Sequence, residues 1–334
     1  MGKKWDGTGI AYDVSVWVEC LRVLKPGGNV LAFGGSRTFH RMAVAVEDAG
    51  FEIRDSIAWM YGSGFPKSLD VSKAIDKAAG TLKVVGQGKA GKTALGQSSG
   101  YNHTNNPHEF DITEPNSPEA QQWEGWGTAL KPAHEPVVVG RKPFAKDSTV
   151  AANVLLHGVG GLNIDASRIG RADGDALGRW PANVILDEYG GGLLDEQSGE
   201  NPSRFYYCAK ASKRDRNEGL DGLEEKGKVY NGQSAEAAGR AEGSVEDKFS
   251  TKPSQNFHPT VKPTTLMRYL IKLVTPPGGT VLDPFTGSGS TGKAALLDGY
   301  KFVGVELTEE YLPIIEGRLR WALEQEGETD ERLF

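Results

Sequence analysis

The chain has 334 residues, 38% of them hydrophobic, which is enough for a sizeable core in one large domain or two ordinary ones. Its net charge of −6 excludes a protein that coats polyanions indiscriminately, so any nucleic-acid site must be a local patch. Two cysteines exclude a disulfide framework, no Cys or His spacing indicates zinc, and no signal peptide or membrane-length apolar run is visible, so we expect a cytoplasmic protein.

The first 60 or so residues alternate between predicted helices and strands. Residues 13–24 have apolar side chains at helical spacing behind an Asp, and an apolar strand over 29–35 follows a KPGG turn. A second helix is expected between Ser36 and Gly50, and a second strand over 51–61. This segment is therefore predicted to be α/β.

The middle of the chain is less regular. From about Gly80 to Gly127 it is rich in Gly, Ser, Asn, Gln and Pro, which predicts a long loop or inserted segment without a compact core. A strand over 135–142 and a helix over 148–158 follow, then short strand-like runs in GLNID and RWPANVILD. Residues 217–255 are again polar and Gly-rich, which suggests a mobile linker.

The end of the chain is the most regular part. A helix over 263–274, a TPPGG turn and the strand TVLD lead into a glycine loop, and a helix, the strand FVGVE and a last amphipathic helix to about Glu324 follow. The expected unit is β-loop-α-β-α. Its loop lies in DPFTGSGST, residues 283–291, and satisfies three nucleotide-binding patterns.

The first pattern is that of a phosphate-binding loop. Gly287 to Lys293 spell G-x-x-x-x-G-K, but Ala294 stands where a hydroxyl should bind magnesium. This interpretation is therefore disfavoured.

The second pattern is G-x-G-x-x-G at Gly287, Gly289 and Gly292, as in a dinucleotide fold, with Glu306 placed to hold a ribose. It leaves a nicotinamide-dependent oxidoreductase as an alternative. The third is an S-adenosylmethionine site that begins at Asp283. Because little chain follows Glu306, the N-terminal segment must supply the other strands of the sheet, which makes the fold circularly permuted.

This order of parts resembles the beta-group DNA amino-methyltransferases over nearly the whole chain. DPFTGSGST is similar to that family's cofactor motif, and GVE (304–306) is similar to its ribose-binding strand end. HPTVKP (258–263) is similar to the motif that contacts the cofactor from the other side. LKPGGNVLAFGG (24–35) resembles the strand that follows the family's catalytic motif. The resemblance implies an α/β, Rossmann-like, S-adenosylmethionine-dependent methyltransferase fold, circularly permuted, with an inserted DNA-recognition region. The implied division is 1–79 for the catalytic half, 80–255 for inserted loops, DNA-recognition region and linker, and 256–334 for the cofactor-binding half.

The implied function is site-specific methylation of an exocyclic amine in double-stranded DNA, of adenine rather than cytosine, and a homodimer or a restriction endonuclease partner is compatible with it. Close backbone approach needs glycine in the loop, and a carboxylate accepts hydrogen bonds from ribose hydroxyls. The expected cofactor-binding residues are Asp283, Phe285, Gly287, Gly289, Ser290, Thr291, Glu306, His258, Thr260 and Lys262. His258 and Lys262 could instead be surface residues before a helix.

A target base must leave the DNA stack to be methylated, and the rest of the duplex needs a basic surface. RFYYCAKASKRDR, residues 204–216, mixes cations with aromatic residues. The expected DNA-binding residues are Arg204, Lys210, Lys213, Arg214 and Arg216. The alternative is that FYYCA is a buried strand followed by a solvated charged turn.

The family's catalytic motif, an acidic or polar residue followed by two prolines and an aromatic residue, is not found. The only Pro-Pro, Pro276–Pro277, lies in the TPPGG turn without an acidic or aromatic flank. By the family pattern the catalytic residues are expected a few residues upstream of Met1, together with a central strand of the sheet. A catalytically incomplete DNA-binding remnant is therefore an alternative to an active enzyme, because the target amine would lack its acceptors.

Overall fold

The protein is described by a computed structural model over residues 8–62, 68–89, 109–170, 178–209, 212–229 and 250–331. The chain divides into two compact units, of which the larger is formed by Met1–Gly62 and His134–Phe334 and the smaller by Ser63–Ala133. The smaller unit is therefore an insertion within the larger one.

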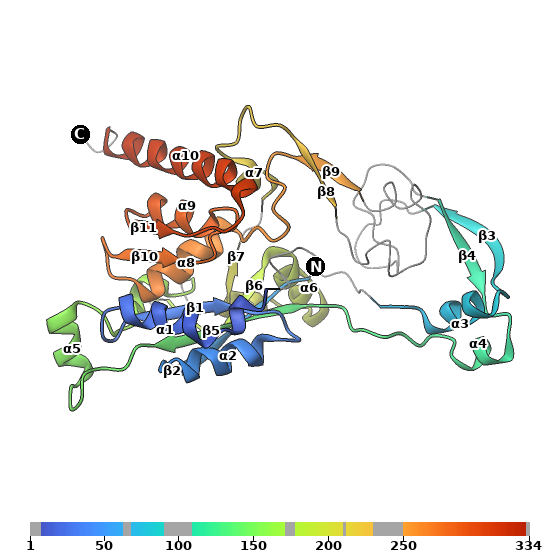
Figure 1. Ribbon diagram of the computed structural model, residues 1–334, viewed down its shortest axis with the longest axis horizontal. Helices are drawn as coiled ribbons and strands as arrows, with labels where there is room; N and C mark the ends of the chain where they lie inside the picture. Colours follow the sequence, from blue (N-terminus) through green and yellow to red (C-terminus); the bar gives the residue numbers. More distant parts are fainter. Residues whose placement is uncertain are drawn as a thin grey trace. The chain divides into compact units, whose positions relative to one another are not determined.

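A five-stranded mixed sheet forms the centre of the larger unit, in the order β1-β5-β2-β6-β7 (Figure 1). The strands are β1 (Asn29–Phe33), β2 (Glu52–Met60), β5 (His134–Arg141), β6 (Val184–Asp187) and β7 (Tyr207–Ala209). Strand β5 runs antiparallel to both β1 and β2, whereas β2, β6 and β7 are parallel. Strands β1, β2, β6 and β7 therefore end at the same edge of the sheet.

Strand β5, which lies between β1 and β2, shows why this sequence forms a sheet with two covered faces. Its valines are buried on alternate sides, as the period of two requires. Val137 and Val139 pack in one cluster with Leu270 of α8 (Thr264–Val274), and Val138 packs in another with Trp17 of α1 (Val14–Val23). The two clusters cover the two faces of the sheet.

The helices of the larger unit follow local sequence signals where these are strong. Helix α1 begins behind Asp13, whose carboxylate accepts a hydrogen bond of 2.9 Å from the Ser15 amide, as an N-cap residue does. The helices are α1 (Val14–Val23), α2 (Phe39–Asp48), α5 (Val150–His157), α6 (Glu188–Ser198), α7 (Lys213–Asn217), α8 (Thr264–Val274), α9 (Ser290–Leu297) and α10 (Leu312–Glu331), with short 3₁₀ turns at Ile10–Tyr12, Asp165–Ser167, Pro202–Phe205 and Glu309–Tyr311. Among the described residues, no helix is both long and apolar enough to cross a membrane.

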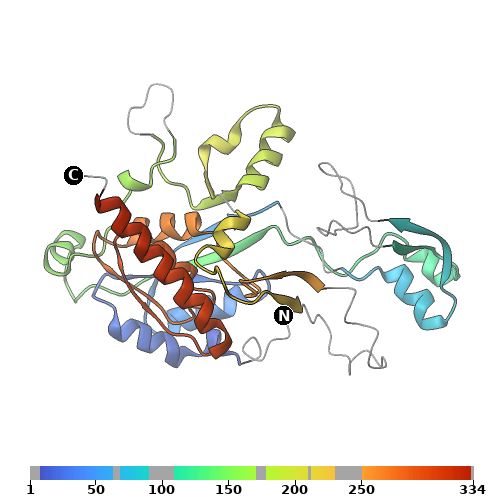
Figure 2. The same cartoon turned by 90° about the horizontal axis from the view of Figure 1, so that it is seen from above.

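A second, two-stranded parallel sheet joins β10 (Thr280–Asp283) to β11 (Lys301–Gly304). Helix α9 packs against both α8 and α10 beside this pair (Figures 1 and 2). Phe33, at the end of β1, and Val281 of β10 pack against one cluster of buried side chains around Ile271. Within the described residues β1 pairs only with β5, and β10 only with β11, so each has an unpaired edge.

The smaller unit consists of α3 (Val71–Ala79), β3 (Lys83–Lys89), β4 (Glu109–Glu114) and α4 (Pro118–Gln122). Strands β3 and β4 are antiparallel. The buried carboxylate of Asp76 accepts hydrogen bonds from the amides of Asn116 and Ser117 and from the Thr81 hydroxyl. Regular structure therefore forms where a long loop without a compact core was predicted, because polar contacts to one side chain replace much of an apolar core.

Three further expectations differ from the structure. GLNID forms no strand, and the nearby element is the 3₁₀ turn at Asp165–Ser167. The predicted linker over 217–255 contains the antiparallel pair β8 (Lys226–Val229) and β9 (Ser250–Ser254), while residues 230–249 lie outside the described residues. The predicted inserted region, 80–255, differs from the inserted unit, because β5, β6 and β7 join the same sheet as β1.

Candidate cofactor site

The glycine loop between β10 and α9 depends on its glycines. Gly287 and Gly289 have positive φ angles of 57° and 73°, which side-chain-bearing residues rarely adopt. A Cβ atom on Gly289 would lie 3.2 Å from the Ile315 Cα, and one on Gly287 would lie 3.0 Å from the His258 Nε2. The loop therefore needs glycine at both positions for its own packing, and close approach of its backbone to a cofactor remains a prediction.

Asp283 ends β10, and its carboxylate shapes the start of the loop. Its Oδ1 accepts a hydrogen bond of 3.0 Å from the Phe285 amide, and its Oδ2 accepts one from the Thr291 hydroxyl. Burial raises the pKa of Asp283, and although these two hydrogen bonds lower it, the nearby Glu306 charge raises it further. A positively charged ligand group beside Asp283 would stabilise its ionised form.

Glu306 follows β11 and faces the same loop. Its Oε2 accepts a hydrogen bond of 2.7 Å from the Gly287 amide, and its Oε1 accepts one of 2.8 Å from the Thr308 amide. Each oxygen of a carboxylate has a second lone pair, so Glu306 can still accept hydrogen bonds from two hydroxyl groups of a ligand. Asp283 and Glu306, predicted from separate motifs, therefore meet at one loop.

His258 lies over the loop from the HPTVKP segment. Its ring is buried and packs edge to face on Tyr311, with ring centroids 4.6 Å apart, and its Nδ1 accepts a hydrogen bond of 3.3 Å from the Thr260 amide. Burial, followed by the charges of Arg216 and other nearby cations, lowers the pKa of His258 to about 4. The imidazole is therefore neutral near pH 7.

Two other predicted cofactor residues point elsewhere. The Lys262 ammonium pairs with the Glu135 carboxylate and lies 5.1 Å and 5.4 Å from the ring centroids of Phe33 and Trp59, at the edge where the parallel strands end. The Ser290 hydroxyl accepts a hydrogen bond of 3.0 Å from the buried Arg318. A role for either side chain in cofactor binding remains a prediction.

The arrangement suits S-adenosylmethionine better than a phosphate group. The ammonium of Lys293 is fully buried and bound to Asp215 and Glu218, so it does not face a ligand as a phosphate-binding lysine would. Paired carboxylates repel phosphate but attract a ligand with hydroxyl, ammonium and sulfonium groups. Phe285 and Leu307, 42% and 76% exposed, provide apolar surface beside them.

The predicted DNA-binding residues divide into outward and inward groups. Arg204 is exposed, with its guanidinium 5.0 Å from the Phe205 ring centroid, and Arg214 is exposed, with an ion pair of 3.2 Å to Glu218. Arg216 turns inward and donates to the backbone carbonyls of Asn256 and His258. Lys210 and the side chain of Lys213 lie outside what the structure describes. Of FYYCA, only Tyr207–Ala209 forms the edge strand β7, in which Ala209 is buried, whereas Phe205 is 47% exposed.

Four polar side chains that were not predicted as site residues hold the loop and the HPTVKP segment by hydrogen bonds. They are Asp215, Asn256, Lys293 and Arg318. The signal was weak. Asp215 stands inside a basic run, and Lys293 was considered only as a phosphate ligand.

Comparison with known proteins places these features in a family. The pattern of the DNA methylase family matches residues 10–317. M.HindIII, a type II methyltransferase from Haemophilus influenzae, is 26% identical over 309 residues, which cover 91% of this chain and 68% of M.HindIII. YhdJ, a DNA adenine methyltransferase of Escherichia coli, is 47% identical over 55 residues, which cover 16% of this chain and 19% of YhdJ. The structure of the M1.HpyAVI–SAM complex aligns with a TM-score of 0.39 at 15% identity, covering 92% of this chain and 81% of that one.

The match spans the five-stranded sheet, the HPTVKP segment and the glycine loop. It confirms the predicted α/β methyltransferase fold and S-adenosylmethionine as cofactor. The alternative interpretation, a nicotinamide-dependent oxidoreductase, was therefore wrong. The chain belongs to the DNA methylase family, the beta-group amino-methyltransferases that use S-adenosylmethionine.

Proposed function

We propose that this chain methylates the exocyclic amine of adenine at a specific sequence in double-stranded DNA. The observation that carries the proposal is the meeting of Asp283 and Glu306 at the glycine loop, under a neutral His258. Adenine is favoured over cytosine by the likeness to YhdJ, whose name states that base. We also propose a cytoplasmic location and, as partners, a second copy of the chain or a restriction endonuclease.

The cofactor-binding roles follow from the chemistry of each side chain. Glu306 would accept hydrogen bonds from the ribose hydroxyls, and Asp283 would lie near a positively charged part of the ligand. Phe285 and Leu307 would cover its apolar parts, and Gly287 and Gly289 let the backbone approach closely. S-adenosylmethionine, when bound, supplies an electrophilic methyl group.

A second candidate function is binding of cofactor and DNA without methyl transfer. The observation that favours it is the unpaired edges of β1 and β10 in the described residues, together with a sequence whose only Pro-Pro has no acidic or aromatic flank. Methyl transfer to an exocyclic amine needs an acceptor for the amine protons and a stacking partner for the base. Neither role is assigned to a residue of the described site.

One experiment tests both candidates. The purified chain is incubated with labelled S-adenosylmethionine and mixed-sequence DNA, nucleosides are identified by mass spectrometry, and cofactor binding is measured by calorimetry. Methyladenine would support the first candidate, and methylcytosine would overturn the choice of base. Cofactor binding without transfer, with recovery when an Asp-Pro-Pro-Tyr strand is added upstream, would favour the second. Failure to bind the cofactor would overturn the site itself.

A further inference from the structure

We infer that helix α7 is a positioning element of the cofactor site, in which Asp215 and Arg216 fix the HPTVKP segment against the glycine loop and thereby set the affinity for the cofactor. The inference rests on the proposed function of the loop as the S-adenosylmethionine site. It assigns to Arg216 a role different from the DNA contact predicted from the sequence.

Arg216 holds the backbone on one side of the site. Its Nη2 donates to the His258 carbonyl at 2.7 Å and its Nε to the Asn256 carbonyl at 3.3 Å. Asn256 is fully buried, and its Nδ2 donates to the Arg216 carbonyl at 2.8 Å while its Oδ1 accepts from the His258 amide at 3.3 Å. These four hydrogen bonds fix the backbone of His258, whose ring lies against Gly287.

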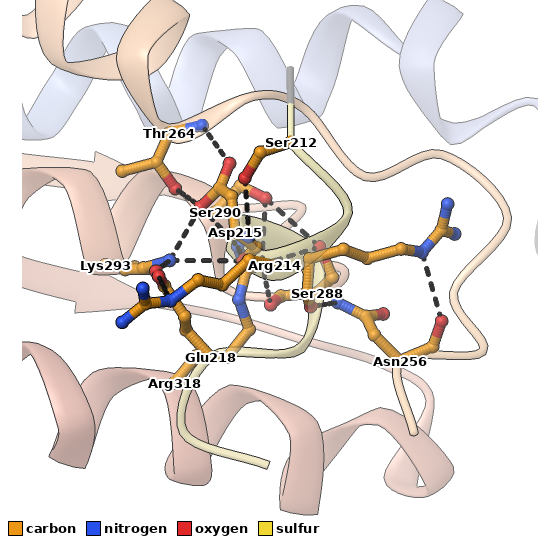
Figure 3. Close-up of polar contacts among 11 residues, drawn as sticks. Ser212, Arg214, Asp215, Glu218, Asn256, Thr264, Ser288, Ser290, Lys293 and Arg318 are labelled. Carbon is orange, nitrogen blue, oxygen red and sulfur yellow. Dashed lines mark hydrogen bonds and ion pairs between the residues drawn. The ribbon is translucent and has the colours of Figure 1, made fainter. Parts of the chain in front are cut away.

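Asp215 connects the same helix to two other elements (Figure 3). Its Oδ2 accepts a hydrogen bond of 2.9 Å from the Thr264 amide at the start of α8, directly after HPTVKP. Its Oδ1 lies 2.6 Å from the ammonium of Lys293, in the helix that follows the glycine loop. One carboxylate therefore joins the two cofactor-binding segments.

Arg318 of α10 completes the connection to the loop. Its side chain is fully buried, and its Nη1 donates to the Ser288 carbonyl at 2.8 Å and to the Ser290 hydroxyl at 3.0 Å (Figure 3). Its Nη2 donates to the Asp215 carbonyl at 3.4 Å. The backbone of Asp215 thus contacts the arginine that holds the loop.

The network is placed where small shifts would alter the cofactor site. Buried charges that are paired hold the groups around them in place, and removing one partner leaves the other uncompensated. Helix α7 spans only Lys213–Asn217, too short to be stable by itself, so it depends on these contacts and in turn transmits any shift between them. A loss of Arg216 would release His258 from its position over Gly287.

Arg214 provides a matched control two residues away. Its side chain is 87% exposed and pairs with Glu218 at the surface, whereas the guanidinium of Arg216 donates to two internal carbonyls. A DNA phosphate could replace the partner of Arg214 without disturbing the site. The same exchange at Arg216 would break the contacts to Asn256 and His258.

The test compares Arg216→Gln, Asp215→Asn and Arg214→Gln in the full chain. Calorimetry measures affinity for S-adenosylmethionine and S-adenosylhomocysteine, and fluorescence anisotropy measures affinity for a mixed-sequence duplex at several salt concentrations. We expect the first two variants to bind the cofactor about tenfold more weakly with an unchanged DNA salt dependence, and Arg214→Gln to bind it as the wild type does.

Either of two outcomes would overturn the inference. In the first, Arg216→Gln binds the cofactor with wild-type affinity and shows a reduced salt dependence of DNA binding. In the second, Arg214→Gln and Arg216→Gln lose cofactor affinity to the same extent. If Arg216→Gln does not fold, Arg216→Lys replaces it. Lysine can reach only one of the two carbonyls, so an intermediate affinity supports the inference and wild-type affinity overturns it. A wild-type chain that binds no cofactor would instead refute the proposed function on which the inference rests.

Discussion

Replacing Lys293 with Met should destabilise the larger unit by about 2–4 kcal/mol. The ammonium is fully buried, 2.6 Å from Asp215 and 2.8 Å from Glu218. Removing one partner of a buried ion pair costs about 3–5 kcal/mol because the remaining charge loses its compensation. We lower that figure because the Asp215 and Glu218 side chains keep 17% and 21% exposure and Asp215 keeps its hydrogen bonds to Thr264. Met has a similar volume, so no large cavity contributes.

Thermal unfolding followed by circular dichroism measures this change. A loss of this size should lower the Tm by roughly 4–16 °C, at about 2–4 °C per kcal/mol for a domain of this size class. The exposed Lys301 of β11 serves as control, since Lys301→Met should change stability by less than about 0.5 kcal/mol.

The pH dependence gives a second measurement. Burial raises the pKa of the Asp215 carboxyl, but hydrogen bonds from Lys293 and Thr264 and the Lys293 charge more than offset this, so the net pKa is lowered. A carboxyl with a lowered folded pKa stabilises the protein above its unfolded pKa of about 3.9 and loses that contribution as the pH falls through the folded value. Lys293→Met should therefore lose less stability than the wild type below about pH 4.

A double variant separates this pair from its surroundings. Asp215→Asn together with Lys293→Met removes both charges, so it should be less destabilising than the sum of the two single changes. A Lys293→Met chain as stable as the wild type would refute the reasoning, because the cost of desolvating the pair would then equal or exceed its attraction.

Three further outcomes follow from local packing and titration. Burial and then nearby cations lower the pKa of His258 to about 4. Between about pH 6.5 and pH 4 the unfolded chain therefore binds a proton at this residue that the folded protein does not bind. The contribution of His258 to the free energy of unfolding should be complete above about pH 6.5 and fall by roughly 3 kcal/mol toward pH 4. Denaturant titrations of His258→Gln should lack that slope. A Cβ on Gly292 would lie 2.5 Å from Leu319 and 2.6 Å from Phe302, so Gly292→Ala should cost about 1–3 kcal/mol, whereas Gly161→Ala, in open space, should not. Leu270→Ala in the core should cost about 2–5 kcal/mol and Leu155→Ala, 88% exposed, less than about 0.5 kcal/mol, as measured by urea unfolding.

Sequence reasoning was most successful where the signals are local. Asp13 as a cap and the glycines of the loop both act within a few residues of themselves. EPVVVGRK was also predicted as a strand, but its place between β1 and β2 depends on pairing with residues far away in the chain. An inserted segment was predicted at about 80–127, but its regular structure was not, because the contacts that hold it converge on a polar side chain, Asp76, which lies before that range.

The same limit applies to the site. Asp283 ends β10 and Glu306 lies two residues after the end of β11, so their common edge follows from the parallel arrangement of these strands. The directions of Arg214 and Arg216 could not be predicted, because a five-residue helix has no periodic pattern and any cation near an exposed turn is expected to be solvated. The partner of Ser290, an arginine of the last helix, was equally invisible in the loop sequence.

The pairing of Met60 with His134 has a consequence for how the protein can change. Met60 is the last residue of β2 and His134 is the first residue of β5, and the two are paired in the sheet. The chain between them therefore leaves the sheet and returns to it at the same point. Residues 61–133 are thus topologically the turn of a β-hairpin, and doubling the length of such a turn costs only about 0.6 kcal/mol of closure entropy. A whole module can therefore be exchanged, enlarged or replaced by a short turn at this position without rethreading any strand of the sheet.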